Sequence, residues 1–176
     1  MAKVRTIPVS QVIDASLGAY TAGDVVGADD CCTTNAIAWQ FDTKKQGSTW
    51  KILEAHLFNE TENQAVQYDL ILFNTSPATG ELRDNAANNN PLKADRLLWL
   101  GTISFPFSIA RGATVATTTQ ATPSTSGRLP MTVKTLDTDS IIYGVLVTRT
   151  AYTQTATDDI TITLELEEVV TVTHPA

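Results

Sequence analysis

The sequence has few of the side chains that most often carry chemistry, with only two cysteines and two histidines among 176 residues. The cysteines, Cys31 and Cys32, are adjacent, and a disulfide between neighbours would close a strained ring. No further cysteine or histidine lies near them at the spacing of a metal site. We therefore expect two reduced residues that behave as small hydrophobic side chains, without a structural disulfide or a metal.

Recognisable catalytic motifs are also missing. His56 falls within a predicted strand, and His174 lies near the C-terminus, where chains are usually loose. The sequence has no G-x-S-x-G elbow, no P-loop and no G-x-G-x-x-G motif. Its short aspartate clusters lack the EF-hand spacing, and aspartate is common in turns. We expect a non-enzymatic protein with no catalytic residue, cofactor, metal or small-molecule ligand; loop calcium and paired carboxylates for sugar hydrolysis remain alternatives.

Long hydrophobic runs and basic clusters are scarce as well. No window approaches the length of a membrane-spanning helix, and the first residues lack the apolar stretch of a signal peptide. The formal net charge is −7, and an acidic chain repels the phosphate backbone. These features predict a protein made in a cytoplasm that binds neither membrane nor nucleic acid.

What the sequence does contain is a strong bias toward β-structure. Hydrophobic residues make up 43% and charged residues 18%, which is typical of a globular domain, and Thr, Val and Ile are frequent. The last predicted strand alternates most cleanly, with Ile160, Ile162, Leu164 and Leu166 on one face. A helix is the alternative for 49–60. The predicted strands cover residues 36–42, 49–60, 66–74, 97–107, 129–135, 140–150 and 159–170.

Several strands with turn-rich connections predict an all-β fold, an antiparallel β-sandwich that is jelly-roll-like with an extended N-terminal arm. We assign residues 1–14 to the arm, 15–170 to one sandwich domain and 171–176 to a C-terminal tail. Within the arm, residues 3–9 alternate and are predicted to be a short strand or an extended segment. The Thr-rich stretch 113–127 is predicted to be an exposed loop or a weak edge strand.

Five stretches occur in a characteristic order: "AYTAGDVVG", "YDLILFNTSP", "DNAANNNPLKADRLLWLGTISF", "LPMTVKT" and "IIYGVLVTRTAYTQTATDDITITLEL". Over residues 15–168 the sequence resembles small virion structural proteins of tailed bacteriophages and prophages. The resemblance implies a head decoration (cement) protein on the capsid surface, assembled in the host cytoplasm. It also implies the major capsid protein as partner and self-association, with a homotrimer expected from the symmetry of a shell. The alternatives are a tail, neck or fibre component and a host-glycan-binding module.

Three regions are predicted to make contacts with such partners. The N-terminal segment lies outside the resemblance, and we expect it to reach a neighbouring subunit or the shell. The Asn-rich stretch 84–95 and the Thr-rich loop are longer than a hairpin requires. Tyr152, in a linker, is expected to be an exposed aromatic residue. The predicted interface residues are Val4, Arg5, Ile7, Val9, Asn88, Asn89, Asn90, Arg111 and Tyr152.

Overall fold

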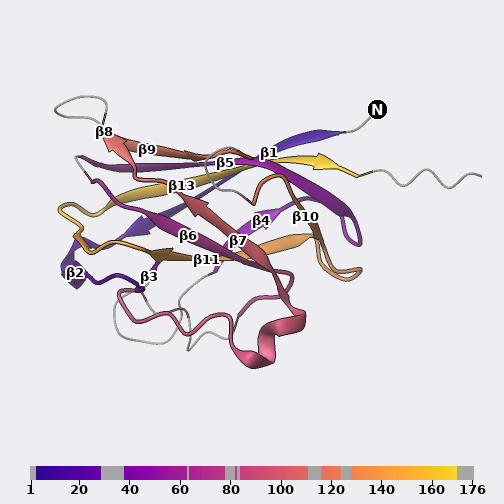
Figure 1. Cartoon of the computed structure of the whole chain (residues 1–176), viewed down its shortest axis with the longest axis horizontal. Helices are drawn as coiled ribbons and strands as arrows, with labels where there is room; N and C mark the ends of the chain where they lie inside the picture. Colours follow the sequence, from indigo (N-terminus) through magenta and orange to yellow (C-terminus); the bar gives the residue numbers. More distant parts are fainter. Residues whose placement is uncertain are drawn as a thin grey trace, which may run out of the picture.

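The computed structural model describes residues 3–28, 38–62, 64–77, 82, 84–110, 116–123 and 128–169. Strands dominate this part of the chain (Figure 1), and the helical segments η1 (Ala15–Leu17) and η3 (Lys93–Leu97) are short 3₁₀ turns. No helix among the described residues is long and apolar enough to cross a membrane. The strands are β1 (Val4–Ile13), β2 (Ala19–Tyr20), β3 (Val25–Val26), β4 (Trp39–Asp42), β5 (Thr49–Glu62), β6 (Tyr68–Phe73), β7 (Trp99–Phe105), β8 (Ile109–Ala110), β9 (Ala116–Ala121), β10 (Met131–Lys134), β11 (Ile141–Thr148), β12 (Tyr152–Thr153) and β13 (Asp158–Glu168).

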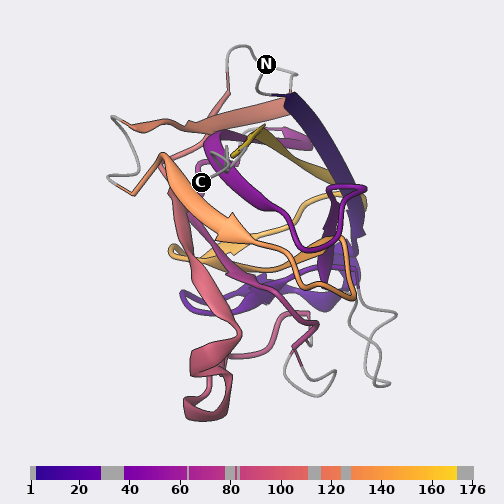
Figure 2. The same cartoon turned by 90° about the vertical axis from the view of Figure 1, so that its right-hand side faces the viewer.

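The strands form two antiparallel sheets that face each other (Figure 2). The first sheet has the order β1-β13-β5-β9-β8, with β10 also paired to β5. The second sheet has the order β3-β11-β6-β7, and β4 pairs with the part of β11 that β3 leaves free. A small separate ladder joins β2 to β12.

The connections between the sheets define the fold. The chain passes from β1 in the first sheet to β4 in the second, back to β5, across to β6 and β7, back to β9, across to β11 and back to β13. The run β1-β13-β5-β9 therefore faces the run β4-β11-β6-β7, which is the interleaved arrangement of a double-sheet jelly roll. The predicted all-β antiparallel sandwich of jelly-roll type is confirmed.

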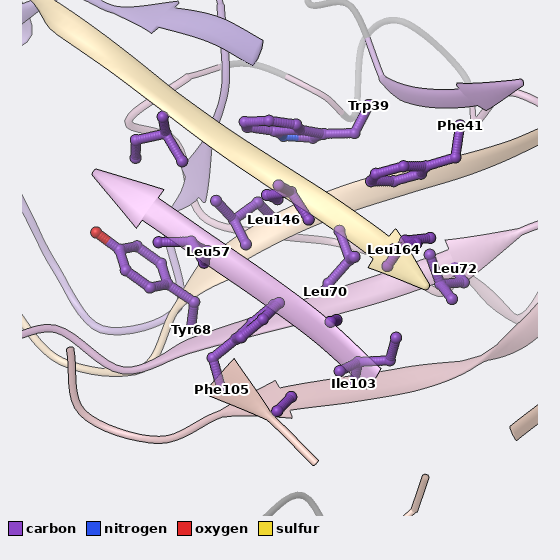
Figure 3. Close-up of a cluster of buried hydrophobic side chains, with 14 of the residues drawn as sticks. Trp39, Phe41, Leu57, Tyr68, Leu70, Leu72, Ile103, Phe105, Leu146 and Leu164 are labelled. Atoms are coloured by element: carbon purple, nitrogen blue, oxygen red, sulfur yellow. The ribbon is translucent and has the colours of Figure 1, made fainter. Parts of the chain in front are cut away.

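Alternation along the strands builds the main core between the sheets. On β13 the side chains of Ile160, Ile162, Leu164 and Leu166 are all fully buried, as their period of two predicts. Leu57 and Leu164 from the first sheet meet Leu70 and Leu146 from the second (Figure 3). Each such aliphatic side chain contributes about 1.5–3 kcal/mol relative to its exposed state.

Strand β5 changes its alternation part of the way along. Trp50 and Ile52 point into the core, and beyond them Ala55 and Leu57 do so, because Leu53 is an extra residue opposite β13. Such a bulge keeps both halves of a long strand facing the core. The segment predicted as a strand at 49–60, with a helix as the alternative, is therefore a strand.

Strand β6 is apolar on both faces, as its sequence indicates, and lies between β11 and β7. Leu70 and Leu72 face the main core, whereas Ile71 and Phe73 face the other side of the sheet. There a second cluster covers the sheet with residues from the connecting segments. Its buried members are Val25, Ala38, Ile71, Phe73, Leu82, Val145 and Val147.

In two segments the structure selects a strand where an arm or a loop was the other prediction. Residues 4–13 of the expected N-terminal arm are strand β1, paired with β13 from Val4 opposite Glu167 to Ile13 opposite Asp158. The reason is that β1 buries Ile13 fully and packs Ile7 and Val9 against the core, so that a free arm would expose apolar surface. Within the Thr-rich stretch, the alternative of a strand near the sheet edge describes β9: it pairs with β5 along its length and with the two-residue β8 only at Thr117 and Thr118, and Thr117 and Thr119 are buried.

Candidate protein-interaction surfaces

Large apolar side chains that remain exposed mark where this sandwich can contact other molecules. Most of those in the described residues fall into three places: the outer face of the first sheet near β8, the turn around η3, and the edge strand β1. The exposed large apolar residues are Val4, Val12, Phe58, Leu92, Leu97, Trp99, Phe107, Ile109 and Val169.

The outer face of the first sheet carries a groove of about 460 Å³. Phe58 points outward because its neighbours on β5, Leu57 and Asn59, are buried in the opposite direction. The register places Phe58 beside Thr118 of β9, which in turn lies beside Ile109 of β8. We call this the sheet groove. Its lining residues are His56, Leu57, Phe58, Pro106, Phe107, Ile109, Thr118, Thr119, Gln120 and Thr122.

The rim of the sheet groove is acidic. Glu54 and Glu60 lie on β5 on the same outward face as His56 and Phe58. Glu54 accepts a hydrogen bond from the Gln120 side chain, and its Oε2 lies 3.7 Å from Nε2 of His56. The groove therefore combines an apolar floor with carboxylates along one side.

The second surface is a protruding turn, which we call the Leu97 turn and define as residues 92–99. It forms the coil at the lower edge of Figure 1. The Asp95 carboxylate accepts a hydrogen bond from the Leu92 amide at 3.0 Å, and the Leu98 amide donates to the Asp95 carbonyl at 2.7 Å. Leu98 packs against the second apolar cluster and anchors the turn to the sheet.

The exposed side of the Leu97 turn is apolar and cationic. Leu97 is 80% exposed, more than any other large apolar residue of the described chain, and Trp99 is 41% exposed. Lys93 and Arg96 are exposed beside them, and neither forms an ion pair within the described residues. On a chain with a net charge of −7, this turn is a local basic and apolar projection.

The third surface is the free edge of β1, which lies along one side of the sandwich (Figure 2). The Glu168 amide donates to the Lys3 carbonyl. With the antiparallel register, the N–H and C=O groups of odd-numbered β1 residues therefore point toward β13, and those of even-numbered residues point away from it. In the described part of the chain no strand pairs with that outer side. Pro8 stands at its middle and lacks an N–H, which is a common protection of an exposed edge.

The predicted N-terminal interface residues divide between the two sides of β1. Val4 is 58% exposed and is available for contact. Ile7 and Val9 are partly buried against the core, and the Arg5 guanidinium lies 5.8 Å from the centre of the Trp50 ring. Arg5, Ile7 and Val9 therefore support the sheet, and a free arm built from all four residues is not what the structure has.

The Asn-rich stretch is pinned to the sandwich and does not project from it. The Asn88 amide donates to the Gly23 carbonyl at 2.9 Å, and the amide of Val25 in β3 donates to the Ala86 carbonyl. Asn88 and Asn90 bond each other through side chain and backbone, and Asn90 is buried. Asn89 alone of the three is exposed, which corrects the expectation that they form one display loop.

Tyr152 is buried, and its predicted exposure is wrong. Its ring stacks on Tyr20 at 4.8 Å between centroids and meets Tyr68 edge-on at 6.1 Å. The β2–β12 ladder brings these rings together, and burial raises the pKa of the Tyr152 hydroxyl. Arg111, Cys31, Cys32, His174 and the tail 171–176 lie outside the described residues.

Sequence reasoning assigned residues 97–107 to a strand and so missed the Leu97 turn. The sequence signal for an interaction surface was four successive large apolar residues, Leu97–Leu98–Trp99–Leu100. A strand with one buried face would leave about half of them exposed, which is unusual unless the exposed side chains have a function. The sheet groove had a weaker signal in Phe105–Pro106–Phe107, where proline ends the strand and places a second phenylalanine beyond it.

Comparisons with known proteins give little similarity. No protein-family model matches the sequence, and no curated protein matches it. Among solved structures, the decameric BFDV capsid protein aligns over 95% of this chain and 100% of its own, with a TM-score of 0.31 and 11% sequence identity. At that TM-score the similarity carries no argument, so the jelly-roll assignment depends on the strand order alone.

Proposed function

We propose that the protein is a non-enzymatic structural component of a tailed-bacteriophage virion that decorates the head by binding the outer surface of the major capsid protein shell. Support comes from the sequence resemblance over residues 15–168 and from the kind of surface that the sandwich exposes. In this proposal it stabilises the head and self-associates on it.

The observation that carries the proposal is the pair of exposed apolar surfaces on a tightly packed jelly roll. The sheet groove and the Leu97 turn together expose Phe58, Phe107, Ile109, Leu97 and Trp99. Exposed apolar side chains that cluster mark candidate interaction sites, and aromatic residues are enriched where partners dock. A subunit that ends in an assembly has a physical reason to keep both surfaces.

Binding to purified phage heads tests the proposal. We expect the protein to sediment with heads that lack it, to saturate at a fixed number of copies per shell, and to raise the temperature at which the heads release DNA. Separated tails and fibres serve as the matched control, because binding there would support the alternative location. Failure to bind any virion part, together with binding on a glycan array, would replace the proposal with the glycan-binding alternative.

A further inference from the structure

We propose that the Leu97 turn of one copy inserts into the sheet groove of another, so that identical chains join head to tail. The proposal deepens the self-association in the proposed function, but it concerns contacts between copies and can fail while binding to heads succeeds.

The apolar parts of the two surfaces have opposite curvature. The Leu97 turn is convex and presents Leu97 and Trp99 from a short turn whose backbone is held by Asp95. The sheet groove is concave, with a volume of about 460 Å³ and a floor that includes Phe58, Phe107 and Ile109. Aromatic and aliphatic anchors that fill a pocket supply most of the energy of such contacts.

The charges of the two surfaces are opposite. Lys93 and Arg96 flank the apolar side chains of the turn, and Glu54 and Glu60 flank the groove along β5. The turn keeps a net positive charge, because its two cations outnumber its one carboxylate, Asp95, which also accepts a hydrogen bond from the Leu92 amide. Opposite potentials on two surfaces of one chain orient the contact and favour a second copy as the occupant.

The positions of the two surfaces exclude insertion within one molecule. In Figure 1 the turn lies at the lower edge, below the second sheet, whereas β8 and β9 lie at the top with the first sheet. A contact between different patches is heterologous, and it closes into a ring when the rotation between copies permits. Three such contacts that close into a ring would give the expected homotrimer.

The test uses two single substitutions that disable one surface each. Leu97→Asp places a charge on the turn, and Ile109→Asp places one in the groove, at residues that are 80% and 60% exposed. Sedimentation velocity of the full chain from about 10 µM to about 1 mM covers the dissociation constants of weak contacts. We expect the wild-type protein to associate, and each variant to require at least tenfold higher concentration for the same average mass.

The decisive sample is an equimolar mixture of the two variants. The Leu97→Asp chain retains its groove and the Ile109→Asp chain retains its turn, so the mixture should form a dimer of twice the 19.0 kDa chain mass and nothing larger. Val4→Asp, at a similarly exposed residue on the β1 edge, is the matched control and should behave as wild type. Thermal melts identify any variant that is unfolded, and Phe107→Ser then replaces Ile109→Asp.

Three results would overturn the inference. They are a wild-type chain that stays monomeric over the whole range, association that neither variant weakens, and a mixture that shows no dimer. Dimers formed by each variant on its own, as readily as in the mixture, would indicate symmetric contacts in which each surface meets its own copy. Binding of the wild-type monomer to heads would, in any of these cases, leave the proposed function standing.

Discussion

At the scale of single residues, the contact between Tyr20 and Asp84 holds the Asn-rich segment against the sandwich. The Tyr20 hydroxyl lies 2.8 Å from each carboxylate oxygen of buried Asp84, whose Oδ1 also accepts from the amides of Gly27 and Asn85. We expect Tyr20→Phe to lower the free energy of unfolding by about 1.5–3 kcal/mol, as for loss of a hydrogen bond to a charged group. Chemical denaturation measures this change.

Tyr152→Phe is the matched control for Tyr20→Phe. The Tyr152 ring stacks on Tyr20, but its buried hydroxyl lies against the neutral Tyr68 hydroxyl and not against a carboxylate. Loss of this neutral contact is expected to lower stability less than loss of a hydrogen bond to a charged group. An equal loss of stability in both variants would show that ring packing, and not the bond to Asp84, is what matters.

Asp42 gives a prediction of pH dependence. Partial burial by itself would raise the pKa of Asp42, but hydrogen bonds from the Lys44 side chain, the Ser140 hydroxyl and the Lys44 amide lower it to about 2. Because the folded pKa is below the ordinary value of 3.8, the ionised carboxylate stabilises the fold above about pH 4. This contribution is lost as the pH falls toward 2.

The Asp42→Asn variant isolates that contribution. It keeps an oxygen that can accept from the Lys44 amide and removes the charge. We expect the stability of the wild-type protein, followed by thermal melts, to fall more steeply between pH 4 and pH 2 than that of Asp42→Asn. Curves that remain parallel over this interval would contradict the assigned role.

Residue-level prediction from sequence succeeded for the core and failed for the surface. Ile160 and Leu164 are buried as the alternation of the last strand predicts, whereas Tyr152 was expected to be exposed because it lies in a linker. Its burial depends on the β2–β12 ladder, a pairing of two-residue strands far apart in sequence. Neither strand is long enough to have a period that a sequence pattern can reveal.

At the scale of elements, Pro8 limits the pairing of other strands with the free edge of β1, because it lacks an N–H. We expect Pro8→Thr to promote edge-to-edge association, since the new N–H faces away from β13 and completes a row of donors on that side. The Leu97→Asp background removes the head-to-tail contact proposed above. The concentration dependence of light scattering is the measurement.

Thr6→Val is the control for the Pro8 prediction. Thr6 faces the same edge and already has an N–H, so the substitution raises β-propensity without adding a donor. Association that rises equally in both variants would mean that the missing donor of Pro8 does not protect the edge.

Strands were predictable here because one face of most of them is buried, which gives a period of two. The pairing of strands was not, because it depends on contacts distant in sequence. The N-terminal segment illustrates both points: its alternation indicated extended structure, and only its pairing with β13 distinguishes an edge strand from an arm. Deletion of residues 2–12 would therefore expose β13 and the core, and single outward-facing substitutions such as Val4→Asp test this region more cleanly.

At the scale of the whole molecule, the sandwich class followed from composition and alternation, while the two interaction surfaces did not. The sheet groove joins Phe58 of β5 to Ile109 of β8 through the register of β9, and the Leu97 turn projects because Leu98 anchors it. A groove between strands that are distant in sequence has no local signature. The expected contact loops were instead chosen by length, and the Asn-rich one proved to be pinned in place.

If opposite charges orient the contact between copies, its strength must depend on salt. We expect the association of the wild-type chain to weaken as the ionic strength rises from about 50 mM to about 500 mM, because screening shortens the range of exposed charges. Sedimentation at both salt concentrations measures the effect. Association that strengthens with salt would assign the contact to its apolar anchors alone.

Charge reversal identifies which groups are responsible. Reversing the turn (Lys93→Glu with Arg96→Glu) or the groove rim (Glu54→Lys with Glu60→Lys) should each weaken association by about two- to fivefold, the range for exposed ion pairs. Both reversals in one chain restore opposite charges across the contact and should recover most of the loss, since only the direction of attraction is exchanged. If the variant with all four substitutions instead associates more weakly than either reversal alone, these carboxylates do not face these cations. The turn of one copy would then lie elsewhere on its neighbour.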